Sequence, residues 1–161
     1  MTSEKGVGVT RHVTITGTRS SADDAGRQLS AVFDDYLRPF ADAAATFYIG
    51  GAAGIDTAAL TWLAENSRAF LVVVVPCTVA DQPAVAGEAI RRFDRGGRLV
   101  EIVELRADKL GTAAFHARNC WMVDRSGFVI GFPRGTDHTS GTWFTLNYAA
   151  EQGKPRLIVP F

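Results

Sequence analysis

Residues 69–75 have the sequence AFLVVVV, and this stretch is the clearest indication of the fold. Its apolar side chains follow one another without a break, and most of them are β-branched. A strand with one face in water alternates apolar and polar residues, whereas an unbroken apolar run is typical of a parallel strand covered on both faces. Pro76 follows at once and lacks a backbone N–H, so the strand ends there. We therefore predict a central strand of a parallel sheet.

The segments on both sides of this strand alternate between strand-like and helix-like patterns. Further strands are expected at residues 12–16, 46–49, 99–105, 127–132 and 156–159. Helices are expected from about residue 23 and at residues 55–66, 83–93, 112–123 and 141–152. Parallel strands need a crossover, usually a helix, and such crossovers are right-handed. The order therefore predicts an α/β, Rossmann-like, doubly wound and mainly parallel sheet with helices on both faces.

The glycine-rich stretch FYIGGAAGID, residues 47–56, joins the end of a strand to the start of a helix. Glycine lets backbone N–H groups approach a ligand closely, and a helix N-terminus offers unpaired donors and a positive dipole end. This combination favours phosphate binding. Asp56 has two interpretations, as a structural acid at the helix start or as a ligand of ribose hydroxyls.

Three further loops carry polar groups at the same predicted edge, where ligands of such sheets bind. The sequence GTRS at 17–20 offers hydroxyls and an arginine fork, FHARN at 115–119 offers an arginine and an amide, and SGT at 140–142 starts a helix. Ser140 or Thr139 is the expected cap of that helix. The simpler alternatives are a solvated turn for the first loop and a solvent-facing helix edge for the second. Two anion-compatible helix starts in one sheet nevertheless favour a phosphate site.

Composition and missing motifs exclude several other functions. The 17 basic and 17 acidic residues give no net charge, which argues against nucleic-acid binding through bulk charge. The basic cluster at residues 91–98 is more typical of a solvated helix face.

The chain has no Walker A loop, no Gly-x-Gly-x-x-Gly after the first strand and no Gly-x-Ser-x-Gly elbow, which disfavours ATPase, dehydrogenase and serine-hydrolase chemistry. The scattered histidines His12, His116 and His138 predict no metal site, and no cofactor is expected.

The length of 161 residues fits one domain. We expect a flexible N-terminus at residues 1–11 and a single Rossmann-like domain at residues 12–161. The polar N-terminus does not have the pattern of a signal peptide, and the longest apolar run, residues 69–77, is too short to span a membrane. Cys77 and Cys120 lie far apart in sequence and are expected to be reduced thiols. These features predict a cytoplasmic protein.

Read in order, the four loops resemble one superfamily. GTR at 17–19, GGAAGID at 50–56, FHARN at 115–119 and SGT at 140–142 are similar to motifs of the Rossmann-like domain of the DNA-processing protein A (DprA, or Smf) family. That domain belongs to the SLOG group, which includes the Lonely Guy phosphoribohydrolases and YspA-like proteins with a similar RNxxM element, here residues 118–122. The resemblance covers about residues 13–160.

The resemblance implies a nucleotide or nucleic-acid phosphate at these loops, and self-association into a homo-oligomer. DprA-like proteins use this site for single-stranded DNA, whereas Lonely Guy enzymes cleave the N-glycosidic bond of a nucleoside monophosphate. The Lonely Guy signature Pro-Gly-Gly-x-Gly-Thr-x-x-Glu is missing, and Asp56 is the one well-placed acid that could replace its glutamate. We therefore predict nucleotide binding, with single-stranded DNA binding or phosphoribohydrolase activity as alternatives.

The candidate ligand-binding residues come from all four loops. Gly17 and Arg19 are expected near the ligand, Gly50, Gly51 and Gly54 around phosphate, and Arg118 paired with it. The full set is Gly17, Thr18, Arg19, Ser20, Gly50, Gly51, Gly54, Asp56, Arg118, Asn119, Ser140, Gly141 and Thr142.

Overall fold

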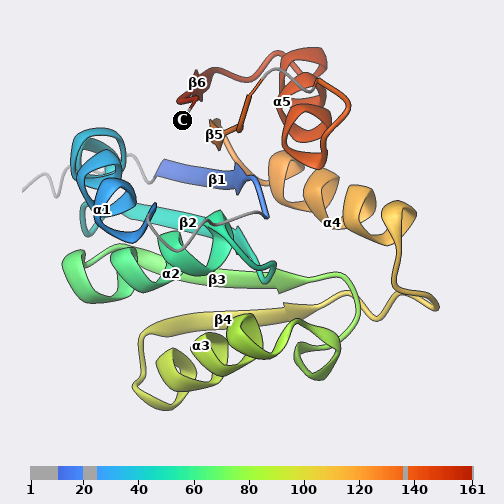
Figure 1. Ribbon diagram of the computed structural model, residues 1–161, viewed down its shortest axis with the longest axis horizontal. Coiled ribbons are helices and arrows are strands. Elements are labelled where there is room, and N and C mark those ends of the chain that lie inside the picture. The colour runs from blue at the N-terminus through green and yellow to red at the C-terminus, as the bar shows by residue number, and fades with distance from the viewer. Residues whose placement is uncertain (1–10, 20–24, 136–137, 161) are drawn as a thin grey trace, which may run out of the picture.

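Six strands, all parallel, form one sheet in the order β4-β3-β2-β1-β5-β6 (Figure 1). The computed structural model describes residues 11–19, 25–135 and 138–160. Within these ranges the strands are β1 (Arg11–Gly17), β2 (Ala45–Gly50), β3 (Phe70–Val75), β4 (Leu99–Glu104), β5 (Phe128–Phe132) and β6 (Arg156–Ile158). The predicted parallel α/β sheet is confirmed. The predicted flexible N-terminus at residues 1–11, apart from Arg11, lies outside the described residues, as does the expected helix start at Asp23.

Helices cover both faces of this sheet, as the sequence predicted. The helices α1 (Ala25–Tyr36), α2 (Ile55–Asn66) and α3 (Ala84–Arg95) lie side by side on one face, and α4 (Thr112–Asp124) and α5 (Gly141–Glu151) lie together on the other (Figure 1). The described residues also form two short 3-10 helices, η1 (Arg38–Phe40) and η2 (Val79–Asp81). Among the described residues, no helix has the length and apolar character needed to cross a membrane.

The strand β3 is buried on both faces because its side chains alternate between two cores. Leu71, Val73 and Val75 pack into the core beneath α1, α2 and α3, while Val72 and Val74 pack against Met122 of α4. Burying one such side chain contributes about 1.5–3 kcal/mol. Phe70, at the start of the strand, is the exception and is half exposed. The unbroken apolar run therefore indicates a strand that is packed between two layers of helices.

The carboxyl ends of β1 and β5 lie next to one another at the point where the strand order reverses. Gly17 at the end of β1 is in register with Phe132 at the end of β5. From β1 the chain continues to α1 on one face, and from β5 it continues to α5 on the other. The loops after β1 and β5 therefore leave toward opposite faces of the sheet. At such a switch point a crevice opens between the loops, and α/β proteins bind ligands there.

Candidate functional site

A cavity of about 460 Å³ opens at this switch point, between the end of β1, the first turns of α4 and the start of α5. This volume lies in the range of small-molecule binding sites. Four segments that are far apart in sequence build its wall: residues 15–19, residues 52 and 56, residues 112–119 and residues 139–142. The four loops singled out in the sequence thus meet at one place.

Five polar side chains of the cavity wall are almost completely buried. Asp56, Arg118, Asn119, Thr16 and Thr142 are exposed by 7%, 3%, 8%, 6% and 5% respectively. Burying a polar group is unfavourable unless it finds a partner, so polar residues rarely gather inside a core. Five of them converging on one cavity are characteristic of a ligand site. The alternative of a solvent-facing helix edge for Arg118 and Asn119 is therefore wrong.

Arg118 places a fixed positive charge in the wall. Its Nε donates a hydrogen bond to Asn119 Oδ1 at 2.8 Å, and its Nη1 donates one to the backbone oxygen of Val74 at 3.4 Å. Burial lowers the pKa of Arg118, Asp56 opposes that effect and Arg19 adds to it. An arginine nevertheless stays protonated in proteins. The guanidinium is thus held in place, as binding of an anion requires.

Asp56, in the first turn of α2, lies near this charge, because both side chains reach the position that a Cβ on Gly50 would take. Its Oδ2 accepts a hydrogen bond from the backbone N–H of Ala52 at 3.2 Å, so the carboxylate also holds the glycine-rich loop in place. Burial raises the pKa of Asp56 from 3.8 to about 7, although Arg118, the Ala52 hydrogen bond and Arg19 all act to lower it. A carboxyl group with this pKa can give and take a proton at neutral pH.

The glycines of the loop serve close packing. Gly54 has a φ of 79° and an added Cβ would lie 2.5 Å from the backbone oxygen of Thr18, so only glycine fits there without strain. A Cβ on Gly51 would lie 2.8 Å from Val75, and one on Gly50 would lie 2.6 Å from Arg118. These three glycines are not among the residues that line the cavity, which Ala52 and Asp56 reach instead. Their predicted contact with phosphate stays a prediction.

The loop after β1 and the start of α5 do reach the cavity. Gly17, Thr18 and Arg19 line it, while Ser20 lies outside the described residues. Ser140 caps α5, as predicted, by accepting a hydrogen bond from the backbone N–H of Trp143 at 3.4 Å. Ser140, Gly141 and Thr142 all line the cavity. A helix N-terminus with unpaired N–H groups therefore faces the space that a ligand would occupy.

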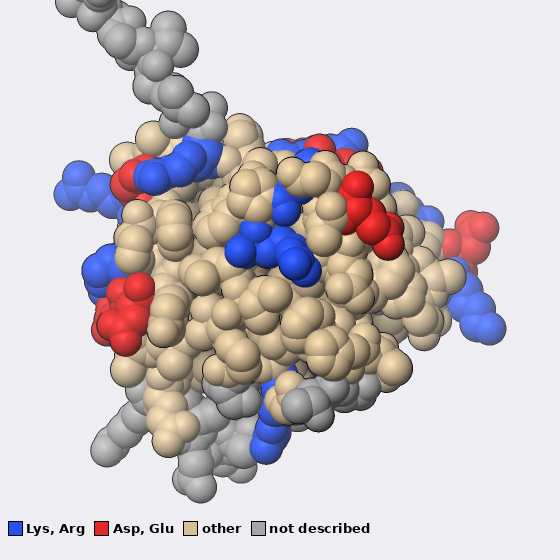
Figure 2. Space-filling model, turned by 90° about the horizontal axis from the view of Figure 1, so that it is seen from above, with Lys and Arg blue, Asp and Glu red and all other residues tan. Residues whose placement is uncertain are grey.

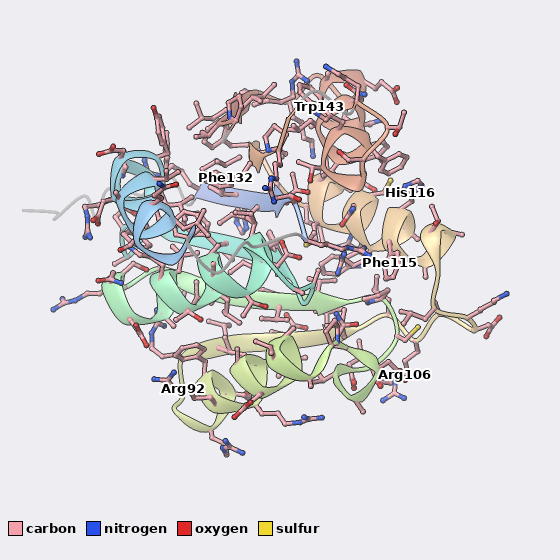
Figure 3. The ribbon with its side chains drawn as sticks, in the orientation of Figure 1. Arg92, Arg106, Phe115, His116, Phe132 and Trp143 are labelled. Atoms are coloured by element: carbon pink, nitrogen blue, oxygen red, sulfur yellow. The ribbon has the colours of Figure 1, made fainter. Side chains whose placement is uncertain are left out.

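Aromatic side chains frame the cavity, and Phe115 and His116 belong to the loop at residues 115–119 that the sequence singled out, although neither was named as a ligand-binding residue. The guanidinium carbon of Arg19 lies 4.1 Å from the ring centre of Phe115, and the ring of His116 stacks on Phe144 at 3.6 Å. Phe115 points toward the ends of the central strands and His116 toward α5 (Figure 3). Thr16, which directly precedes the loop at Gly17, was missed, and Thr139 was predicted only as a possible cap of the helix at 141–152. Within the described ranges, no group of His, Cys, Asp and Glu residues is arranged to hold a metal ion.

Solved structures show that this is a DprA-like Rossmann fold. DNA processing protein A from Helicobacter pylori, studied for its single-stranded DNA binding mode, matches 94% of this chain with a TM-score of 0.67 and 21% identity. DNA processing protein A from Streptococcus pneumoniae matches 94% with a TM-score of 0.68 and 20% identity. The protein TM1055 matches 91% of this chain and 72% of its own with a TM-score of 0.57 and 16% identity.

The likeness concerns the fold. This chain spans 66% of the Helicobacter pylori structure and 50% of the Streptococcus pneumoniae structure, less than two thirds of either. No protein-family model matches the chain, and no curated protein sequence matches it. The expected DprA-like fold is confirmed, and the function must be argued from the cavity itself.

Proposed function

We propose that the cavity at the β1–β5 switch point binds a nucleotide or a nucleotide-derived small molecule. The observation that carries this proposal is the convergence of five buried polar side chains on one cavity at the start of a capped helix. Charged and hydroxyl groups that are buried toward a cavity are oriented before a ligand arrives, which reduces the entropy lost on binding.

Phosphate is assigned to the space between Arg118 and the start of α5. Arg118 supplies a fixed cation, Thr142 a hydroxyl group, and the first turn of α5 its unpaired N–H groups. Asp56 and Asn119 are the groups in the wall that suit ribose hydroxyls, because their side-chain oxygens accept hydrogen bonds. Arg19 and Phe115 form the rim, where a planar base can stack.

Calorimetry with a panel of nucleoside monophosphates tests this assignment. Arg118 is deeply buried, so replacing it would affect folding as well as binding. The informative change is therefore Thr142→Val, which removes one hydroxyl group and keeps the shape of the side chain. We expect about a tenfold weaker affinity, the typical contribution of a hydrogen bond to a charged group. Thr145→Val is the matched control, because Thr145 lies one turn further along α5 and does not line the cavity. Absence of binding by every nucleotide, or equal losses in both variants, would contradict the proposal.

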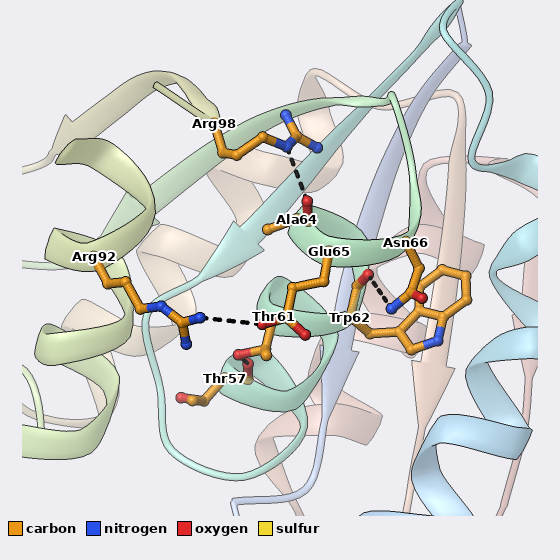
Figure 4. Close-up of polar contacts among 8 residues, drawn as sticks. All are labelled: Thr57, Thr61, Trp62, Ala64, Glu65, Asn66, Arg92 and Arg98. Atoms are coloured by element: carbon orange, nitrogen blue, oxygen red, sulfur yellow. Dashed lines mark hydrogen bonds and ion pairs between the residues drawn. The ribbon is translucent and has the colours of Figure 1, made fainter. Parts of the chain in front are cut away.

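The comparisons favour single-stranded DNA as a second candidate ligand, since the Helicobacter pylori protein binds it. The charge pattern gives this candidate less support. In the view of Figure 2 the Lys and Arg side chains form small separate groups interspersed with Asp and Glu. Of the basic cluster at residues 91–98, Arg92 pairs with Glu65 and Arg98 binds backbone oxygens (Figure 4). Fluorescence anisotropy of a labelled oligonucleotide at increasing salt concentrations tests whether DNA is a ligand, because DNA binding predicts a steep loss of affinity with salt.

Asp56 gives the phosphoribohydrolase alternative its specific support. A pKa of about 7 suits a general acid for a leaving base or a general base for an attacking water. The test is chromatography of nucleoside monophosphates after incubation with concentrated protein. Release of free base by the wild type and not by Asp56→Asn would establish hydrolysis, and no release by either would leave the cavity a binding site.

A further inference from the structure

A second hollow of about 350 Å³ adjoins the nucleotide cavity along α5. Three residues, His116, Thr139 and Ser140, line both spaces. The start of α5 therefore forms their common border. A ligand whose phosphate lies at this helix start can extend into either space.

The walls of the second hollow suit a planar base. His116 and Phe144 stack with their ring centres 3.6 Å apart and their planes inclined by 4°, and His138 stacks on Trp143 at 4.3 Å. These contacts hold the rings in fixed orientations, and His116, Phe144 and His138 present them to the hollow. Any nucleic-acid base can stack on such a ring, because every base has a π-face.

The polar groups of this hollow are unsuited to phosphate. Asn147 and Glu151 line it, and none of its described lining residues is Lys or Arg. A carboxylate repels phosphate, whereas it accepts hydrogen bonds from the amino groups of a base, and an asparagine amide can bind a base edge through two hydrogen bonds. The hydroxyl group of Tyr148 already donates to Asp124 Oδ1 at 2.6 Å, which fixes that ring in the wall.

We propose that the second hollow binds the second nucleoside unit of a dinucleotide whose linking phosphate lies at the start of α5. This inference rests on the proposed function, because it places the first unit in the cavity described above. It deepens that function by naming the ligand class as two nucleoside units joined through phosphate.

The test compares AMP with the linear dinucleotide pApA in calorimetry. We expect pApA to bind about tenfold more tightly, the size of effect that one stacked base contributes. His138→Ala should reduce this advantage to about twofold because it removes a stacking ring, and Asn147→Ala should reduce it through the loss of a hydrogen bond to the base edge. Both variants should leave the AMP affinity unchanged, since neither residue lines the first cavity. Gln28→Ala, on the opposite face of the sheet, is the matched surface control and should keep the full advantage. Thermal denaturation checks that each variant folds.

The outcomes separate the two proposals. Binding of AMP with no advantage for pApA overturns the second subsite and leaves the nucleotide site in place. Failure of both ligands to bind overturns both proposals. Much tighter binding of a longer single-stranded oligonucleotide than of pApA overturns the dinucleotide assignment in favour of a continuing strand.

Discussion

Gly50, at the end of β2, leaves the space that the guanidinium of Arg118 occupies. A Cβ on Gly50 would lie 2.6 Å from Arg118 Nη1 and 2.8 Å from Asp56 Oδ2, which is closer than real side-chain carbons approach other atoms. Arg118 is 3% exposed and hydrogen bonded, so it has little room to move away. The absence of a side chain at Gly50 therefore allows Arg118 and Asp56 to lie near one another in the cavity wall.

The first prediction concerns this glycine. Gly50→Ala should lower the free energy of unfolding by about 1–3 kcal/mol, as overpacking of a buried site does, and should weaken nucleotide binding because Arg118 is displaced. Urea unfolding and calorimetry measure the two effects. Gly127→Ala is the control, because an added Cβ there meets no atom within 4 Å. Equal stability of the two variants would show that Arg118 is free to move.

The second prediction concerns the dependence of stability on pH. Burial raises the pKa of Asp56 to about 7, so the folded protein keeps a proton that the unfolded chain releases near pH 4. The contribution of Asp56 is fully present below about pH 4 and is lost as the pH rises to about 7. The free energy of unfolding should therefore fall across this window, with a slope of up to about 1.4 kcal/mol per pH unit from this group.

Asp56→Asn removes that component, so its stability should depend less steeply on pH between 4 and 7 than that of the wild type. Urea unfolding at a series of pH values measures both curves. Asp94→Asn, which changes an exposed aspartate on α3, should retain the wild-type slope. Parallel curves for Asp56→Asn and the wild type would show that Asp56 is not protonated in the folded protein.

The third prediction assigns a structural role to one member of the basic cluster. Arg98 donates a hydrogen bond to the backbone oxygen of Ala64 near the C-terminal end of α2 (Figure 4). It also donates to the backbone oxygens of Leu63, Ser67 and Ala69, and the four distances are 3.0–3.4 Å. Backbone oxygens in the last turn of a helix, such as that of Ala64, have no further turn to bond them, and the helix dipole also favours a cation there. The Leu63 oxygen in addition accepts hydrogen bonds from the backbone N–H and Oγ of Ser67. Arg98→Met should lower the free energy of unfolding by about 1.5–3 kcal/mol in urea.

Arg95→Met, in the same cluster, should change stability by less than about 0.5 kcal/mol, because Arg95 is exposed. A comparable loss in both variants would argue against a specific role for Arg98 at the helix end.

The fourth prediction separates the rim of the cavity from a similar contact elsewhere. Arg19 lies over Phe115 at 4.1 Å, and Arg38 lies over Trp62 at 4.9 Å on the α1–α2 side. Each exposed contact is worth about 0.5–1 kcal/mol. Arg19→Ala and Arg38→Ala should therefore have similar small effects on the melting temperature. Only Arg19→Ala should weaken nucleotide binding in calorimetry, and unchanged affinity in that variant would remove Arg19 from the site.

The element order could be predicted because it rests on local patterns. The helix at residues 55–66 has the predicted bounds, and the six strands and the helices α3, α4 and α5 agree with their predictions to within one or two residues. The two 3-10 helices were not predicted. Ser140 was recognisable as a cap because capping depends on a residue and its own next turn. The glycine loop was found for the same reason, but its local pattern did not reveal that Gly54 packs against the β1 loop.

The sequence by itself determined the parallel sheet, the helices on both faces and the loops that meet at one edge, because hydrophobic periodicity acts over neighbouring residues. Only the tertiary structure decided that Arg118 and Asp56 are buried beside one another, that Gly50 makes room for them, and that His116 and Ser140 border two adjoining hollows. Those relationships join segments from β2, α2, α4 and α5 that are distant in sequence. They arise from how the layers pack, which no local pattern records.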